Sequence, residues 1–516
     1  MIDLFAGPGG LAEGFAAVSV ADRKRPFHIA LSIEKEKIAH STLLFRAFLR
    51  QFKNGFPSAY YSFLNEEIAE PDWASDYPAE WEAATNEALL MELGAKGTDA
   101  KLKPYLDSIH AKFPDRTIVI GGPPCQAYSV VGRARNKGKA DYKPEKDKRH
   151  FLYRDYIKIL EKLRPAAFVM ENVKGMLSSS VGGQAIFKRI LDDLDAIGGD
   201  AKTYELYAFE LGAEGAGALR PTREPRDFLI RAEMFQVPQA RHRIIIVGVR
   251  RDFVADQPAD REAANLAPGS RVSVSEIVKK LPPLRSGISR QDSLEEWTAA
   301  MTRSIAKVIE ATRSSSDKNL QKVNKRSLIF AKKIARGQHP VLRTSSAMGA
   351  LSETCPQTLQ SWIIDPMLTR LQGHSSRGHM ESDLARYFFA SVFAETCGRS
   401  PVAREYPVAL APSHKNWNSG IFSDRFRVQL WGTPSTTITS HISKDGHYFI
   451  HPDPIQCRAL TVREAARLQT FPDNYRFLGN QTQQFEQVGN AVPPYLARQI
   501  GEALYGLLSQ KGKVFV

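Results

Sequence analysis

Cysteine is scarce in this sequence. Its 516 residues include four cysteines, Cys125, Cys355, Cys397 and Cys457, and no two of them stand in a CxxC spacing. We therefore expect no zinc site built from cysteine pairs and no metal. Four cysteines in so long a chain also fall short of a disulfide framework, which favours a reduced, intracellular protein.

Long apolar runs are missing as well. No stretch of about 18 apolar residues occurs, so we expect no membrane span. The chain starts Met-Ile-Asp-Leu-Phe-Ala-Gly, without the basic segment and apolar stretch of a signal peptide. Both absences favour a cytoplasmic protein.

Basic residues outnumber acidic ones. The 70 Lys and Arg against 56 Asp and Glu give a net charge of +14 and a pI of about 9.4. Such a balance favours a polyanionic partner, nucleic acid before membrane, although many basic proteins bind no nucleic acid. A hydrophobic content of 43% over this length is ample for a large core and predicts at least two lobes.

Strands and helices alternate in the first half of the sequence, which predicts an α/β fold. The start reads as a βαβ unit, with a strand at 2–5, a glycine-rich turn, a helix at 11–18 and a strand at 29–33. Further expected elements are a mostly helical stretch at 35–116, strands at 117–120, 167–170 and 244–249, a helix ending before Pro165, and a last helix starting at Pro493-Pro494.

Three of these strands lead directly into residues that are candidates for binding or catalysis. Phe5 leads into the glycine turn, Ile120 into the loop of Cys125, and Met170 into Glu171. In an open parallel sheet, ligands bind outside the carboxyl ends of the strands. We therefore expect these three segments to meet at one crevice.

The glycine turn matches a nucleotide-binding fingerprint. Gly7-x-Gly9-x-x-Ala12 follows the first strand, and Glu34 ends the second strand where an acid can bond ribose hydroxyls. A tight turn with a solvated Glu34 is the alternative. The turn alone does not separate S-adenosylmethionine from NAD, so a dehydrogenase also fits these first 35 residues.

The loop at 121–129 reads GGPPCQAYS, with two prolines fixing the backbone before Cys125. A lone cysteine is more often a buried structural residue. This loop, however, resembles the catalytic loop of the C5-cytosine-specific DNA methyltransferases of restriction–modification type. Five further blocks resemble those of the family, in its order: DLFAGPGG at 3–10, ENV at 171–173, QARHR at 239–243, RALTVREAARLQTFP at 458–472 and GNAVPP at 489–494.

The resemblance implies a Rossmann-like methyltransferase sheet with a second, smaller target-recognition domain. We expect 1–255 to form the catalytic and S-adenosylmethionine-binding domain, completed by a C-terminal helix within 480–516. The stretch 256–479 would then be the target-recognition region.

By this resemblance, Cys125 attacks C6 of a flipped cytosine so that C5 can take a methyl group. Full ionisation of the thiol raises the reaction rate by at most a factor of ~10 to 30, whereas enzymes usually need a rate enhancement of at least ~10⁶. The ring must therefore be activated at N3, and Glu171 is the candidate. Arg243 would hold the cytosine O2, and Arg241 would position the ring or the cysteine loop; their strand is expected to run antiparallel.

The same resemblance assigns S-adenosyl-L-methionine as cofactor, with S-adenosyl-L-homocysteine as product. The expected cofactor residues are Phe5, Ala6, Gly7, Gly9, Gly10, Leu11, Glu34, Pro123, Asn490 and Val492. The family usually has a further acid that bonds the adenine amine. The sequence does not place it, and Glu67 is a guess only.

Double-stranded DNA is the implied substrate. The expected DNA contacts are Gln126, Ser129, Arg133, Arg135 and Gln239, with a basic loop at 131–149 closing over the extruded base. The basic window at 313–343 either binds phosphates or is a solvated helix face. The segment 436–441 is a further candidate for backbone contacts.

Several expectations about role come from the family. The family implies a monomer in the cytoplasm of a bacterium or phage host, associated with the nucleoid, that acts beside a separate cognate restriction endonuclease or as an orphan methylase. A tRNA cytosine-5 methyltransferase is the close alternative, and the large 256–479 region argues against it. A catalytically inactive DNA-binding relative would be expected to lose Cys125 or Glu171, and both are present.

Overall fold

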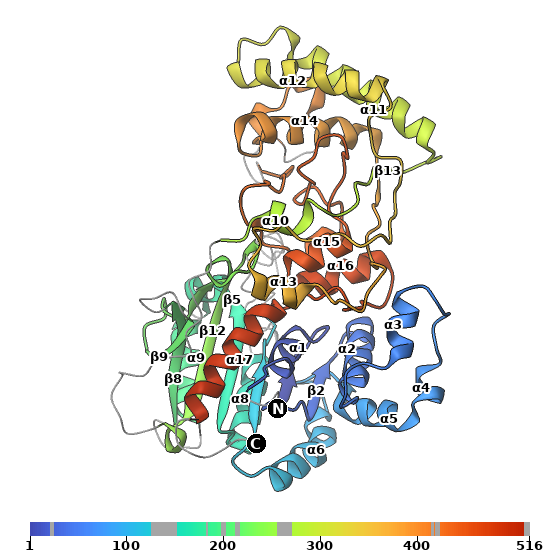
Figure 1. Cartoon of the computed structure of the whole chain (residues 1–516). Helices are drawn as coiled ribbons and strands as arrows, with labels where there is room; N and C mark the ends of the chain where they lie inside the picture. The colour runs from blue at the N-terminus through green and yellow to red at the C-terminus, as the bar shows by residue number, and fades with distance from the viewer. Residues whose placement is uncertain are drawn as a thin grey trace. The chain divides into compact units, whose positions relative to one another are not determined.

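The chain divides into two compact units in the computed structural model, which describes residues 1–20, 25–124, 152–181, 184–197, 203–211, 217–254, 271–413, 417 and 424–509. The first unit draws on 1–58, 70–270 and 491–516, and the second on 59–69 and 271–490. Each unit is described by itself, with element labels as in Figure 1.

A nine-stranded sheet forms the centre of the first unit within the described residues (Figure 1). Across the sheet the strands are β3 (Ala88–Leu90), β2 (Leu31–Glu34), β1 (Ile2–Leu4), β4 (Ile118–Gly121), β5 (Ala167–Val173), β12 (His242–Arg250), β8 (Tyr204–Leu211) and β9 (Gly217–Pro221), with β10 (Leu229–Arg231) also beside β12. Strands β1 to β5 are mutually parallel, whereas β12 is antiparallel to β5 and β8. The order of strands reverses between β1 and β4, so the carboxyl ends of these two strands flank a topological switch point.

Helices cover both faces of this sheet. On one face lie α1 (Gly10–Ala16) and α17 (Pro494–Ser509), and on the other lie α6 (Thr98–Lys112), α8 (Leu152–Leu163) and α9 (Ile186–Asp195). Side chains alternate along a strand, so Ala167 and Val169 of β5 pack with the first group and Phe168 and Met170 with the second. Beside the β3 edge lie α2 (Lys37–Arg50), α4 (Trp73–Asp76) and α5 (Pro78–Glu87).

The α/β class expected from the sequence is confirmed, as is the antiparallel β12. The stretch 35–116 is mostly helical as expected, and it also contains β3, whose three residues are too few to show alternation. One detail was wrong. Strand β5 does not stop before Glu171 but runs to Val173, because β12 continues to pair with its backbone as far as that residue.

The second unit is mainly helical. Its longest helices, α11 (Leu294–Arg313), α12 (Lys318–Ala335) and α14 (Glu381–Cys397), pack around an apolar core that includes Trp297, Phe330 and Phe388 (Figure 1). The remaining elements of this unit are α3 (Ser58–Leu64, from Ala59 on), α10 (Val274–Val278), β13 (Gly287–Ile288), α13 (Gln357–Ile363), β14 (Gly378–His379), β15 (Ser435–Thr436), α15 (Val462–Leu468) and α16 (Gln481–Asn490).

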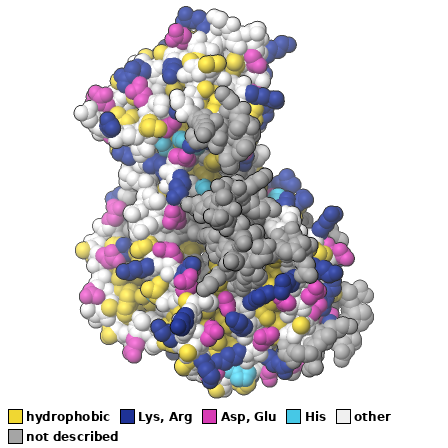
Figure 2. Space-filling model, turned by 180° about the vertical axis from the view of Figure 1, so that it is seen from behind, with side chains coloured by type: hydrophobic (Ala, Val, Ile, Leu, Met, Phe, Trp, Pro, Cys, Tyr) yellow, Lys and Arg dark blue, Asp and Glu magenta, His cyan; other side chains and the backbone are white. Residues whose placement is uncertain are grey.

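Among the helices of the described residues, none is long and apolar enough to cross a membrane. On the face of the first unit drawn in Figure 2, Lys and Arg side chains stand among acidic ones. The described charged side chains on that face therefore do not form a patch of one sign.

Helix α17 packs closely against α1 through a glycine. A Cβ on Gly14 would overlap the carbonyl oxygen of Pro494 and the side chain of Ala497, whereas a Cβ on Gly506 of α17 would meet no atom within 4 Å. Helix α17 therefore packs against α1, the helix that follows the glycine turn, too closely for a side chain at Gly14.

We predict opposite effects of one substitution at these two glycines. Gly14→Ala should cost about 1–3 kcal/mol through overpacking, whereas Gly506→Ala should gain up to about 1 kcal/mol because alanine favours a helix interior. Thermal unfolding midpoints of both variants measure this. A Gly14→Ala midpoint equal to or above that of the unchanged protein contradicts the close packing.

Candidate functional site

The turn after β1 adopts a left-handed backbone at three positions. Phe5, Gly7 and Gly9 have φ values of 58°, 58° and 99°. The Gly9 N–H donates to the Ala6 carbonyl at 3.0 Å, which closes the turn and starts α1. Glycine adopts this conformation at little cost, so the two glycines are required by the backbone itself.

Glu34 holds this turn from the end of β2. Its Oε2 accepts from the Gly7 N–H at 2.8 Å, and its Oε1 accepts from the N–H groups of Lys35 at 2.9 Å and Glu36 at 2.7 Å. A carboxylate offers about four lone-pair sites, so acceptor capacity remains for a ligand hydroxyl. The arrangement fits an adenosine ribose at this turn.

The closing block of the sequence also reaches the glycine turn. A Cβ on Gly10 would overlap the Val492 carbonyl oxygen and lie 3.4 Å from the Cβ of Ala491. The Ala491 carbonyl accepts from Arg241 Nη2 at 2.9 Å. Since Leu11 and Val492 both belong to the apolar cluster under α1 and α17, they can offer a ligand mainly their backbone atoms.

Asn172 supports the turn that leads to Cys125. The side chain of Asn172 is buried, and its Nδ2 donates to the Pro123 carbonyl at 3.2 Å. The Oδ1 of the same amide accepts from the Val173 N–H at 2.7 Å, which fixes its orientation. The sequence pattern gave Asn172 no role, although it lies in the quoted 171–173 block.

Glu171 forms an ion pair with Arg243, with Oε1 2.9 Å from Nε. The two residues come from neighbouring antiparallel strands, in which Glu171 pairs with Ile245 and Arg243 with Val173. Burial lowers the pKa of Arg243, and the Glu171 carboxylate opposes that shift. Burial also lowers the pKa of Arg241, an effect to which Arg243 adds.

Gly122 lies directly against this ion pair. A Cβ at Gly122 would stand 2.9 Å from Glu171 Oε2. Strands β4 and β5 are parallel and in register, with Gly121 opposite Met170, so the turn after β4 passes over Glu171. The carboxyl ends of β1, β4 and β5 therefore bring together the glycine turn, the 121–124 turn and the Glu171–Arg243 pair.

For the other predicted site residues, the described residues of the first unit do not test the prediction. Cys125, Gln126, Ser129, Arg133, Arg135 and the loop 131–149 lie outside the described residues. Asn490 ends α16 in the second unit, and Glu67 also belongs to that unit. Gln239 begins β11 (Gln239–Ala240) and is buried; its DNA contact stays a prediction.

Two acids near the glycine turn were missed. Asp3 lies in β1 and is fully buried, and burial raises its pKa to about 8 although Arg50 and the Ala12 N–H act in the opposite direction. Glu92 comes two residues after β3, and its Oε1 lies 3.1 Å from Lys35 Nζ. Glu92 was missed because β3 is too short to be recognised, and the apolar pattern of β1 gave Asp3 no role of its own.

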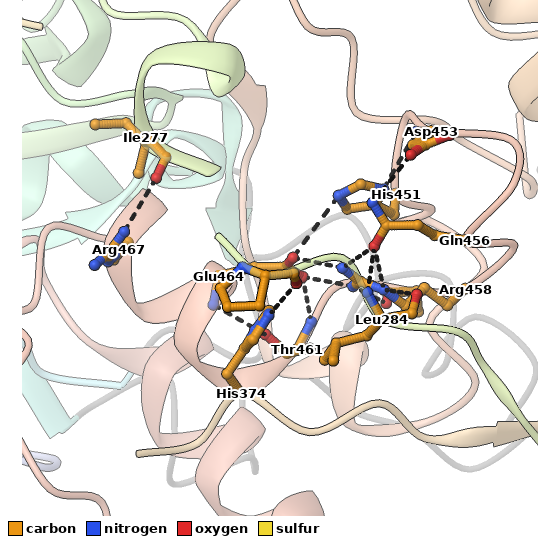
Figure 3. Close-up of polar contacts among 12 residues, drawn as sticks. Ile277, Leu284, His374, His451, Asp453, Gln456, Arg458, Thr461, Glu464 and Arg467 are labelled. Carbon is orange, nitrogen blue, oxygen red and sulfur yellow. Dashed lines mark hydrogen bonds and ion pairs between the residues drawn. The ribbon is translucent and has the colours of Figure 1, made fainter. Parts of the chain in front are cut away.

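A buried ion pair organises the second unit (Figure 3). Both terminal nitrogens of Arg458 lie 2.7 Å from oxygens of Glu464, and Gln456 Oε1 accepts from Arg458 Nη2 at 2.8 Å. Glu464 Oε2 also accepts from the Thr461 N–H at 2.7 Å and so caps α15. Burial raises the pKa of Glu464, but Arg458 outweighs it and holds that pKa well below its ordinary value.

Neutral histidines complete this network. His451 Nδ1 accepts from the Asp453 N–H at 3.2 Å, which places the ring proton on Nε2, and this nitrogen lies 3.7 Å from Glu464 Oε1. His374 lies between Thr461 Oγ1 at 3.1 Å and the Pro282 carbonyl at 2.8 Å. Burial lowers the pKa of His451 to about 3 and also lowers that of His374.

The described residues hold no group of three or more His, Cys, Asp or Glu side chains suited to a metal ion.

Comparison with known proteins identifies the chain's family. The sequence profile of the C-5 cytosine-specific DNA methylases matches residues 98–506. The chain belongs to this family, whose members are enzymes that use S-adenosylmethionine.

Individual relatives cover the whole chain. The type II methyltransferase M.Bpa9945I of Bacillus paralicheniformis is 31% identical over 525 residues, which is 99% of both chains. The type II methyltransferase M.AgeI of Thalassovita gelatinovora is 25% identical over 98% of both. Among solved structures, a prophage-encoded protein of E. coli described as a DNA modification methyltransferase shares the fold, with a TM-score of 0.52, 16% identity and 98% coverage of both chains.

We predict that Gly122→Ala impairs methyl transfer through Glu171. The added methyl group must displace the Glu171 carboxylate, and misplacing a reacting group by about 1 Å can cost about 100-fold. A steady-state assay should show kcat reduced about 10- to 100-fold, with S-adenosylmethionine affinity unchanged. Gly432→Ala, whose Cβ would meet nothing within 4 Å, is the matched control. Equal kcat values for both variants contradict the contact.

We also predict that acid destabilises the second unit. His451 and His379 have pKa values lowered to about 3 by burial, against about 6.5 in an unfolded chain. The unfolded state therefore binds more protons between these values, so stability is complete above pH 6.5 and falls as the pH drops toward 3. Each histidine contributes about 1.4 kcal/mol per pH unit within this window.

The thermal midpoint measured from pH 7.5 to pH 5 tests this. His451→Asn keeps an acceptor for the Asp453 N–H but cannot titrate, so its midpoint should depend less on pH. A pH dependence as steep as that of the unchanged protein argues against the histidine origin.

Proposed function

We propose that this protein methylates C5 of cytosine in double-stranded DNA, with Cys125 as nucleophile and S-adenosylmethionine as methyl donor. The observation that carries the proposal is the Glu171–Arg243 ion pair beside the 121–124 turn, which leads directly into Cys125. A carboxyl group and a guanidinium at this spacing match the N3 and O2 edge of a cytosine ring.

The cofactor would lie on the turn after β1. Phe5, Ala6, Gly7, Gly9, Gly10, Leu11, Glu34, Pro123, Asn490 and Val492 are the proposed contacts. Glu34 would accept from the ribose hydroxyls while its bonds to the turn persist. Glu92, which follows the strand beside β2, is the acid we propose for the adenine amine in place of Glu67. When bound, S-adenosylmethionine supplies an electrophilic methyl group on a sulfonium.

The chain's own residues would activate the base. Cytosine C5 is a weak nucleophile until the Cys125 thiolate adds to C6, which converts the ring to an enamine. The target base must first leave the duplex, at a cost of a few kcal/mol. Arg241 would fix the closing block through Ala491 and so keep the pocket shaped for the base.

Glu171 has to share a proton with cytosine N3. Its Oε1 lies 2.9 Å from Arg243 Nε in the described structure. A cytosine that enters would draw Arg243 toward O2, which frees Glu171 Oε1 to face N3. The ion pair would thus hold the acid in place until the substrate releases it.

We assign target recognition to the second unit, which covers most of the stretch 256–479. Its buried Arg458–Glu464 pair would keep the recognition surface rigid. Gln126, Ser129, Arg133, Arg135 and Gln239 are proposed DNA contacts of the catalytic part. In this scheme the protein is a monomer in the cytoplasm of a bacterium or phage host, where it modifies the nucleoid DNA beside a separate restriction endonuclease.

Methyl transfer with labelled cofactor tests the proposal. The purified protein and Cys125→Ala are each incubated with tritiated S-adenosylmethionine and either mixed-sequence duplex DNA or bulk tRNA. Label should enter DNA only, as 5-methylcytosine, and vanish in the variant. Label in tRNA would move the substrate to RNA. Cofactor binding without transfer to either would indicate an inactive DNA-binding relative.

A further inference from the structure

Helix α12 presents a stripe of positive charge. Five exposed side chains lie at helical spacing along it: Lys318, Lys322, Lys325, Lys332 and Arg336. At 3.6 residues per turn they fall within about 80° of the helix circumference and span about 27 Å. We call these five residues the α12 stripe.

The opposite face of α12 is fixed to the rest of the three-helix core. Val323, Phe330 and Ile334 are buried in that core. Arg326 forms an ion pair with Glu395 of α14 at 2.5 Å, and Asn324 Nδ2 donates to the Ile309 carbonyl of α11 at 2.7 Å. The stripe is therefore held on a rigid element and points away from the core.

The stripe is not neutralised by the described part of the chain. No acidic residue occurs from Lys318 to Arg336. Three other arginines of the same three helices do pair with acids: Arg303 with Glu381, Arg326 with Glu395 and Arg386 with Asp383. Among the described residues, none of the five stripe cations forms an ion pair.

An uncompensated stripe costs helix stability. Lys318 with Lys322, Lys322 with Lys325, and Lys332 with Arg336 are like-charged neighbours three or four residues apart. Each such pair destabilises a helix by about 0.2–0.5 kcal/mol. On a solvated helix face this repulsion is a net cost to stability. Next to a row of phosphates the same charges would instead contribute a favourable free energy. Ile329 lies in the middle of the stripe and is also exposed, at 46%, which suits contact with a sugar.

We propose that the α12 stripe binds the phosphate backbone of duplex DNA and adds affinity that does not depend on sequence. The inference rests on the proposed function, in which duplex DNA is the substrate. The stripe is shorter than one turn of B-DNA, about 34 Å, so one backbone strand can follow it along the helix. Lysine and arginine contacts to phosphate set affinity, and base contacts elsewhere set the target.

The salt dependence of DNA binding tests the stripe. The triple variant Lys322→Gln, Lys325→Gln, Lys332→Gln is compared with the control triple Lys96→Gln, Lys101→Gln, Lys112→Gln, which removes the same charge from exposed positions of the first unit. The dissociation constant of a mixed-sequence duplex is measured from 50 to 300 mM salt. Each lost phosphate contact lowers the slope of log affinity against log salt by about 0.9.

The stripe variant should lose about 2 to 3 units of this slope and bind at least about tenfold more weakly near 150 mM salt. The loss should be equal for duplexes that are and are not methylated, and the KM for DNA should rise accordingly. The thermal midpoint of the triple variant should not fall, because repulsion between the lysines is relieved. If the midpoint does fall, the single variant Lys325→Gln is used instead, with an expected slope change of about 0.9.

A slope equal to that of the control triple overturns the proposal, as does weakened binding to tRNA with unchanged binding to duplex DNA. Failure of methyl transfer in the unmodified protein would contradict the proposed function instead. The two failures are distinguishable, because the salt slope is measured without any transfer.

Discussion

Three parallel strands in register, β1, β4 and β5, set the geometry on which the rest of the first unit depends. Leu4 stands opposite Gly121, and Gly121 opposite Met170, so all three strands end at one edge of the sheet. Backbone pairing sets this register, and side chains packed on both faces of the sheet support it. The glycine turn, the 121–124 turn and Glu171 are thereby brought to one edge, where the side chains of Glu34 and Asn172 hold the two turns.

The second unit depends on a different kind of constraint. Arg458 and Glu464 are both about 1% exposed, so their charges are stable only as a pair with every donor and acceptor satisfied. Gln456 and Thr461 provide some of those bonds from nearby in the sequence, and the Leu284 carbonyl provides another from 174 residues away. Such a network tolerates few alternatives, which suits a surface that has to present fixed contacts. The α12 stripe belongs to the same unit but needs only rigidity and charge.

The sequence predicted the parts of the site that depend on local pattern. The glycine turn, the strands on either side of it, and the neighbouring positions of Glu171 and Arg243 could be inferred from short blocks and from strand ends. Strand β3 could not, because three residues at the edge of the sheet, with Leu90 half exposed, carry no periodic signal. With β3 missed, Glu92 had no place in the scheme. The roles of Asn172 and Arg458 depend on hydrogen bonds to residues 49 and 174 positions away, which no local pattern reports.

The central claim is that Cys125 adds to C6 of a cytosine at this sheet edge, and a trapped adduct measures it most directly. Duplex DNA in which 5-fluorocytosine replaces cytosine is incubated with the protein and S-adenosylmethionine. After methylation, C5 carries fluorine where a proton would normally leave, so the elimination that frees the enzyme cannot occur. We predict a covalent complex that forms only with cofactor and whose mass spectrum places DNA on the peptide containing Cys125. No adduct, or an adduct on Cys355, Cys397 or Cys457, would contradict the account.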